Sequence, residues 1–253
     1  MFSIELECEP DQREVLIADL WEQGSAGISE LSERCLRAFF EDTADRDSLL
    51  SRYPGATART EETRDWVQEA RDLLQPMLVG QRFYLVPEWR DDPTPSGRFR
   101  IAVNPGLAFG TGVHETTQLC LEALEELVRP GMTVLDVGAG SGILSRAARL
   151  LGAGRVFACD IDPDAVTVAG EGFIGSADAA RTGIADVVVA NISPEAIIQL
   201  APDLLRALRP GGVLVASGFE SHECAAVERA LPAPRAVRRK GNWAAFLVDR
   251  GLR

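Results

Sequence analysis

Hydrophobic and polar positions in the first 60 residues alternate first with the period of a strand and then with that of a helix. FSIELE alternates like a strand, and PDQREVLIADLWEQG has helical apolar spacing between a proline start and a glycine stop. AGISEL and RCLRAFF then indicate two short strands around a turn at SE, DRDSLLSRY a helix and ATART a last strand. The order β-α-β-β-α-β predicts a small α+β, ferredoxin-like domain over residues 1–60.

A connecting region is predicted over residues 61–103. TEETRDWVQEARDLLQPM has the apolar spacing of a helix. FYLVPEW and FRIAVNP indicate two strands, and the proline- and glycine-rich DDPTPSG between them predicts a reversal of the chain.

From about residue 115 the pattern changes to helices that alternate with short, almost continuously apolar strands. The strands are TVLDVG, RVFACDID, ADVVVANI, GGVLVASGF and finally AVRRKGNWAAFLVD, with helical patterns before and between them. Such strands are typical of a parallel sheet that is covered on both faces. Residues 104–253 therefore predict an α/β domain of Rossmann-like type, with Thr116 and Thr117 available to cap its first helix.

The turn after the first strand of this domain carries the strongest chemical signal. In VLDVGAGSGIL the strand ends near Asp136, and Gly138, Gly140 and Gly142 lead into a helix. Glycines let the backbone turn sharply and let a ligand approach closely. The spacing GxGxG is neither the GxGxxG of dinucleotide binders nor the GxxxxGK[ST] of nucleoside triphosphatases.

The next strand ends at Asp160, 22 positions after Gly138, and is well placed to accept hydrogen bonds from two ribose hydroxyls. Because ligands of open parallel sheets bind at the carboxyl ends of the strands, the turn and this acid together predict a nucleoside site. The carboxylate of Asp136 would repel a pyrophosphate but suits an ammonium or sulfonium group. This charge favours S-adenosylmethionine over a nicotinamide cofactor.

Asn191 ends the strand of ADVVVANI, so its amide emerges at the same predicted edge of the sheet. Its side-chain oxygen is able to accept an N–H from an amine and so turn the nitrogen lone pair toward a methyl group. His114 is the nearest candidate general base, and we interpret it as a hydrogen-bonding residue of its loop. The five scattered cysteines and two histidines form no metal-ligand pattern, so no metal is predicted.

NPGLAFGTGVHETT, LDVGAGSGIL, DIDPDA and VVVANI resemble, in this order and spacing, the PrmA family of protein methyltransferases. The resemblance covers most of the chain and implies a class I methyltransferase that uses S-adenosylmethionine. It implies methylation of lysine side chains and the N-terminal amine of ribosomal large-subunit protein eleven. It also implies that the N-terminal unit is the substrate-recognition domain.

The resemblance places functional residues on this sequence. It implies that Asn191 is the active-site asparagine and that the segment from Phe109 to Gly112 closes over the methionine end of the cofactor. The predicted cofactor-binding residues are Phe109, Gly110, Thr111, Thr117, Asp136, Gly138, Gly140, Asp160 and Asn191.

The sequence departs from the family pattern in two places. Only 29 positions separate Asp162 from Asn191, so the intervening helix is expected to be short and to lack the further strand that the family has there. This shortening falls where the family encloses the adenine ring. Ser193 stands where related N-methyltransferases often have an aromatic residue for cation–π contact.

The net charge of −12 and the pI near 4.7 argue against a nucleic-acid-binding surface and favour a basic protein partner. The chain begins without a signal-peptide pattern, and its apolar runs are shorter than about 18 residues, so a cytoplasmic location without a membrane partner is expected.

Two other functions stay open at this point. One is an N-methyltransferase that acts on another protein or a small amine, and the other is a non-catalytic, cofactor-binding assembly protein. A nicotinamide dehydrogenase is disfavoured because the turn is GxGxG and no acid–base pair suited to hydride transfer is visible.

Overall fold

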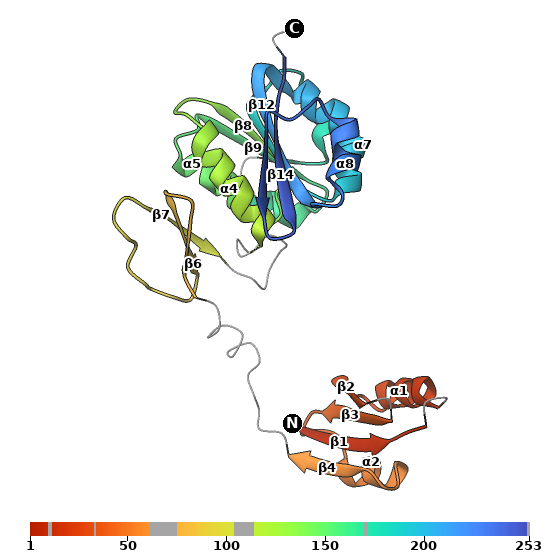
Figure 1. Cartoon of the computed structure of the whole chain (residues 1–253). Coiled ribbons are helices and arrows are strands. Elements are labelled where there is room, and N and C mark those ends of the chain that lie inside the picture. The colour runs from red at the N-terminus through yellow and green to blue at the C-terminus, as the bar shows by residue number, and fades with distance from the viewer. Residues whose placement is uncertain (10–11, 33, 61–74, 104–113, 170–171, 252–253) are drawn as a thin grey trace. The chain divides into compact units, whose positions relative to one another are not determined.

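The protein is described from a computed structural model (Figure 1). The structure describes residues 1–9, 12–32, 34–60, 75–103, 114–169 and 172–251. The chain divides into two compact units, Met1–Leu73 and Leu74–Arg253. This division is coarser than the three-part division predicted above, which stays a prediction. The predicted connector helix falls almost entirely on residues 61–74, outside the described residues.

The smaller unit contains a four-stranded antiparallel sheet in the order β2-β3-β1-β4. Its elements are β1 Phe2–Glu7, α1 Arg13–Glu22, β2 Gly27–Ser32, β3 Cys35–Phe40, α2 Arg46–Arg52 and β4 Thr57–Thr60. Ile4, Leu36 and Phe40 are fully buried in its core, as expected where strands alternate between an inner and an outer face. The element order and the strand order confirm the ferredoxin-like prediction.

A three-stranded sheet opens the larger unit, with β5 Met77–Val79, β6 Phe83–Pro87 and β7 Phe99–Val103. β6 and β7 pair in parallel, so the predicted simple reversal between them is wrong. The loop between them is long enough to return to the start of β6, where the Phe99 N–H donates to the Arg82 carbonyl at 2.6 Å. The Arg100 guanidinium holds the loop by donating to the carbonyls of Arg90 and Asp92.

The main sheet of the larger unit has seven strands in the order β10-β9-β8-β11-β12-β14-β13. They are β8 Thr133–Val137, β9 Arg155–Asp160, β10 Gly172–Ile174, β11 Ala185–Asn191, β12 Leu208–Glu220, β13 Ala236–Lys240 and β14 Trp243–Asp249. The single closing strand expected over AVRRKGNWAAFLVD forms two strands, β13 and β14. β14 is antiparallel to both neighbours, which corrects the all-parallel prediction. Gly241, with φ +56°, lies in the turn that reverses the chain into β14.

Helices cover both faces of this sheet (Figure 1). The helices are α4 Glu115–Leu127, α5 Ile143–Leu150, α6 Pro163–Ala169, α7 Pro194–Ala207 and α8 Cys224–Ala230, with a short 3-10 turn at Ala177–Ala179. α4 and α5 contribute Leu124 and Leu144 to one core, and α7 and α8 contribute Leu204 and Val227 to the other. The observed layers confirm the predicted α/β, Rossmann-like class.

The segment after α6 differs from the sequence prediction. We expected no strand there, but β10 pairs in parallel with β9, with Gly172 opposite Ala158. A side chain at Gly172 would collide with the Ala158 carbonyl, so a glycine is needed where these backbones meet. A strand of three residues is too short to show the periodicity by which strands are recognised.

Ion pairs attach α4 to the strand hairpin formed by β13 and β14. Lys240 Nζ lies 3.2 Å from Glu122 Oε1, and Arg238 pairs with Glu126.

Within the part of the chain that the structure describes, we find no helix with the length and apolarity needed to cross a membrane.

We expect Leu124→Ala to lower the free energy of unfolding of the larger unit by about 2–5 kcal/mol, because Leu124 is fully buried in α4 and its truncation leaves a cavity. Urea unfolding followed by circular dichroism measures the change. Leu78→Ala is the control: Leu78 is 55% exposed on β5, and its change should stay within about 0.5 kcal/mol. Equal losses in the two variants would contradict this packing.

Candidate active site

The predicted site residues of three strands meet at the carboxyl edge of the main sheet. β8 lies between β9 and β11, and Val137 pairs with Cys159 on one side and with Ala190 on the other. The residues that follow these positions, Gly138, Asp160 and Asn191, therefore lie at one edge. This is where ligands of open parallel sheets bind.

The glycine turn is held against the end of β9. The Gly138 N–H and the Ala139 N–H donate to the Cys159 carbonyl, at 2.8 and 3.2 Å. Gly138, Gly140 and Gly142 all have positive φ, at +72°, +49° and +69°. The turn therefore requires glycine at these three positions for its backbone conformation. It places Gly142 as the N-cap of α5.

Asp160 uses both carboxylate oxygens to order its surroundings. Oδ2 accepts from the Gly140 N–H at 2.9 Å, and Oδ1 accepts from the Asp162 N–H at 3.0 Å. Each carboxylate oxygen accepts more than one hydrogen bond, so acceptor capacity is left for a ligand's hydroxyls. Next to it, Ile161 is 81% exposed, and Ile174 at the end of β10 is 63% exposed. Asp160 thus joins the glycine turn to a partly apolar surface.

Asp136 is completely buried in β8, two residues before Gly138. Its Oδ2 accepts a hydrogen bond from Ser145 Oγ at 2.7 Å, whereas its Oδ1 has no partner among the described residues. Burial raises the pKa of Asp136 to about 6, against the opposing effect of the Ser145 hydrogen bonds. Asp136 is therefore a buried acid with one unpaired oxygen next to the glycine turn.

These groups fit a nucleoside that carries a positive charge. Asp160 supplies acceptors for hydroxyls, and the unpaired Oδ1 of Asp136 supplies a negative partner near the turn. Within the described residues we find no cluster of three His, Cys, Asp or Glu side chains that would hold a metal ion.

Thr117 and Asn191 meet across 74 positions of sequence. Asn191 Nδ2 donates to Thr117 Oγ1 at 3.3 Å. The capping prediction for Thr116 and Thr117 is wrong, because the N-cap of α4 is His114, whose Nδ1 accepts from the Thr116 N–H. The His114 ring also lies edge-on to Trp243, with 4.5 Å between ring centroids. These contacts agree with the interpretation of His114 as a hydrogen-bonding loop residue.

The remaining predicted residues of the loop, Phe109, Gly110 and Thr111, lie outside the described residues. Ser193 is the N-cap of α7 and accepts from the Ala196 N–H at 3.3 Å. Its observed contact is thus a helix cap.

Two residues near the site were missed by sequence reasoning. Ser145 is fully buried in α5, directly after the apolar Ile143 and Leu144, and a polar residue at such a position was the available signal. Gly218 has φ +105° and packs against the backbone of Ile192. A glycine inside a predicted strand indicates a bulge or a close approach, and the pairing of β12 with β14 does shift between Ser217 and Phe219.

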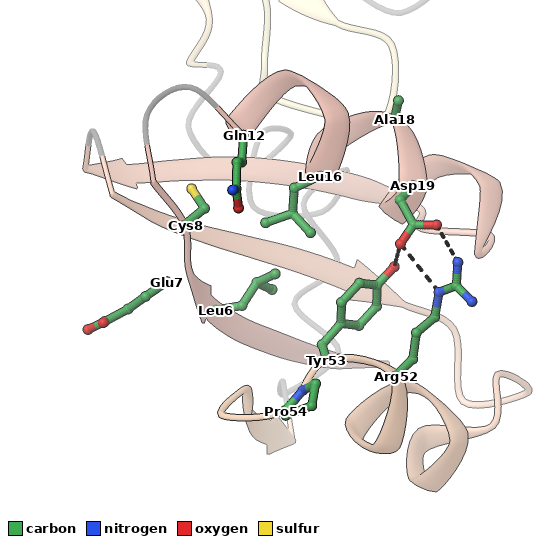
Figure 2. A pocket seen from close by; sticks show the side chains of 10 residues that line it. All are labelled: Leu6, Glu7, Cys8, Gln12, Leu16, Ala18, Asp19, Arg52, Tyr53 and Pro54. Carbon is green, nitrogen blue, oxygen red and sulfur yellow. Dashed lines mark hydrogen bonds and ion pairs between the residues drawn. The ribbon is translucent and has the colours of Figure 1, made fainter.

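A separate groove of about 690 Å³ lies in the smaller unit (Figure 2). Leu6, Leu16 and Tyr53 form apolar parts of its wall. Asp19 accepts from Tyr53 Oη at 2.7 Å and pairs with Arg52 at 2.6 Å.

The sheet order, the glycine turn and the acid at the end of β9 define a Rossmann-like, class I methyltransferase domain. The family model described as ribosomal protein L11 methyltransferase (PrmA) matches residues 11–250. The chain belongs to the PrmA family.

Individual relatives agree with this assignment. The ribosomal protein L11 methyltransferase of Symbiobacterium thermophilum is 40% identical over 207 residues, covering 76% of this chain and 68% of the relative. That of Pelobacter propionicus is 36% identical over 257 residues, covering 87% and 83%. The crystal structure of a ribosomal protein L11 methylase from Lactobacillus delbrueckii subsp. bulgaricus is similar with a TM-score of 0.63 and 32% identity, covering 70% of this chain and 100% of that chain.

We expect Asp136→Asn to change how stability depends on pH. The pKa of Asp136 in the folded protein lies above that of an unfolded aspartate. The free energy of unfolding therefore falls as the pH rises from the pKa of the unfolded aspartate through about 6, where the buried carboxyl ionises. The asparagine variant lacks this loss, so it should gain about 1 kcal/mol relative to the native protein between pH 5 and pH 7.5. Thermal unfolding without ligand measures the difference.

Asp91→Asn, in an exposed loop, is the matched control and should follow the native pH profile. Parallel pH profiles for Asp136→Asn and the native protein would contradict the assigned ionisation.

Proposed function

We propose that this protein transfers methyl groups from S-adenosylmethionine to amines of ribosomal protein L11. The proposal rests on one observation above all: a chain of the PrmA family brings the glycine turn, Asp160 and Asn191 to one edge of its sheet. By resemblance to that family, the acceptors are lysine side chains and the N-terminal amine. The similarity over residues 11–250 favours this substrate over another protein or a small amine.

Several residues would hold the cofactor. Asp160 would accept hydrogen bonds from the ribose hydroxyls, and the backbone at Gly138 and Gly140 would let the nucleoside lie close. Asp136 would face the positive charge of the methionine part. Phe109, Gly110, Thr111 and Thr117 complete the proposed binding set.

When bound, S-adenosylmethionine would supply a methyl group on a positively charged sulfur. The carbon–sulfur bond would break with its electron pair left on sulfur, and the amine nitrogen would gain the methyl group and release a proton to solvent. A free lysine has a pKa near ~10.4, so the site must favour its neutral form. Burial of the amine beside the sheet edge lowers its pKa. Asn191 Oδ1 would accept an N–H of the amine and direct its lone pair. We propose that proximity and alignment carry the catalysis.

The smaller unit is proposed as the domain that recognises the substrate. Residues 1–60 carry 13 acidic and 6 basic side chains, which would attract a basic ribosomal protein and disfavour nucleic acid. Trp21 and Leu31 of this unit are 52% and 46% exposed and would offer apolar contacts. A ribosomal protein substrate also agrees with action in the cytoplasm.

Mass spectrometry of purified ribosomal protein L11, after incubation with the enzyme and isotopically labelled S-adenosylmethionine, tests the reaction. We expect mass increases in steps of one methyl group with the native enzyme, and a rate at least about 100-fold lower with Asn191→Ala, because the acceptor for the amine N–H is lost. Cofactor binding of this variant, measured by calorimetry, should be kept and should weaken far less than turnover does, because Asn191 is only one of the predicted cofactor-binding residues. An unmodified substrate would overturn the function, and near-native turnover by Asn191→Ala would overturn the role of Asn191.

Asp160→Asn should weaken the binding of S-adenosylmethionine by about 10- to 100-fold, because the negative charge and one of the two acceptor oxygens for the ribose hydroxyls are lost. Isothermal calorimetry measures the dissociation constant. Asp162→Asn is the matched control: this neighbouring acid is exposed, and its Oδ1 accepts from the Asp164 N–H. If both variants bind as the native protein does, Asp160 is not the ribose-binding residue.

A further inference from the structure

The side chain of Asn191 is anchored by a residue of another element. Thr117, in the first turn of α4, is only 1% exposed, and its hydroxyl accepts a hydrogen bond from Asn191 Nδ2 at 3.3 Å. Asn191 itself is half-buried at the end of β11. A hydroxyl buried against this amide links α4 directly to the candidate catalytic group.

The backbone that follows Asn191 is also held in place. The Ile192 N–H donates to the Ser217 carbonyl at 3.1 Å. Gly138 contacts Ile192 from one side, because a Cβ there would overlap Ile192 Cγ2. Gly218 contacts it from another, because a Cβ there would overlap the Ile192 carbonyl. With the backbone fixed by these contacts, rotation of the side chain is the main freedom left to Asn191.

The direction of an amide side chain decides its chemistry. Its two branches have opposite polarity, since the nitrogen only donates and the oxygen only accepts hydrogen bonds. Nδ2 is occupied by Thr117, whereas Oδ1 has no hydrogen bond to the part of the chain that the structure describes. The free branch is therefore an acceptor. If the amide were rotated by half a turn, a donor would meet the N–H groups of an incoming amine.

We propose that Thr117 is a positioning residue for methyl transfer: its hydroxyl binds the Nδ2 branch of the Asn191 amide and leaves the Oδ1 branch for the substrate amine. This inference rests on the proposed function and adds to the cofactor contact proposed for Thr117. Its effect should fall on the catalytic step, because the orientation of the amide matters when the amine is aligned for attack.

A double-mutant cycle in the full chain tests the proposal. We compare Thr117→Val, which replaces the hydroxyl by a methyl group of similar size, with Thr117→Ser, which keeps the hydroxyl. At saturating cofactor and ribosomal protein L11, Thr117→Val should lower kcat by about tenfold, and Thr117→Ser should stay within about twofold. In the Asn191→Ala background, Thr117→Val should change kcat by less than about twofold, because its effect passes through the amide.

The matched control is Thr116→Val. Thr116 is 4% exposed and lies at the neighbouring position, but its hydroxyl contacts His114 Nδ1 at 2.8 Å. This variant should keep kcat within about twofold of the native value. Calorimetry with S-adenosylmethionine measures the part of any loss that comes from cofactor binding.

Three results would overturn the proposal. They are native kcat in Thr117→Val, equal losses in the valine and serine variants, and the same loss from Thr117→Val with and without Asn191. If Thr117→Val does not fold, Thr117→Ala is measured in the same cycle.

A second measurement does not depend on activity. The side-chain NH₂ signal of Asn191 in a ¹⁵N-labelled sample, assigned by its loss in Asn191→Ala, should shift and exchange faster in Thr117→Val but not in Thr116→Val. An unaffected signal would overturn the inference alone. A shifted signal in a protein that leaves ribosomal protein L11 unmethylated would overturn the proposed function and leave the contact in place.

Discussion

Backbone N–H groups of the turn after β8 donate hydrogen bonds to the end of β9, and the geometry of the site depends on these bonds. Gly138 and Ala139 donate to one carbonyl, that of Cys159, and Gly140 donates to the carboxylate of Asp160. The start of α5 and the direction of the Asp160 carboxylate are thereby set together. A change at either strand end would move both. The binding groups thus form one connected unit of backbone and carboxylate.

The same edge contains an unfavourable group. Asp136 is buried, its Oδ1 has no hydrogen-bond partner in the described part of the chain, and its pKa is raised because burial disfavours the charged form. The hydrogen bond from Ser145 offsets only part of that effect. If folding stability alone mattered, a neutral residue at this position would be more favourable than an aspartate. Unfavourable buried groups of this kind are common at ligand-binding sites, where function and stability make opposing demands.

Much of the architecture was predictable because strands covered on both faces and strand-end motifs are local patterns. Most helices and strands of the larger unit, the ferredoxin-like order and the meeting of Gly138, Asp160 and Asn191 follow from periodicity and position, whereas the three-residue strand β10 does not. Pairing between distant segments does not. The parallel pairing of β6 and β7 is accompanied by contacts of Arg100 within the loop between them. β14 lies between β12 and β13 and pairs with β12, whose residues are far away in the sequence. The contact between Thr117 and Asn191 joins residues 74 positions apart, so no local sequence pattern predicts it.

The ion pair between Lys240 and Glu122 has a consequence for the chemistry of the protein itself. Lys240 is the single lysine of the chain, and every other basic side chain apart from histidine is an arginine. Its ammonium group is half-buried and forms an ion pair with the Glu122 carboxylate at 3.2 Å. Guanidinium groups stay protonated and are poor nucleophiles. An enzyme that methylates lysine amines therefore has almost no side chain of its own that would compete with its substrate for the methyl group.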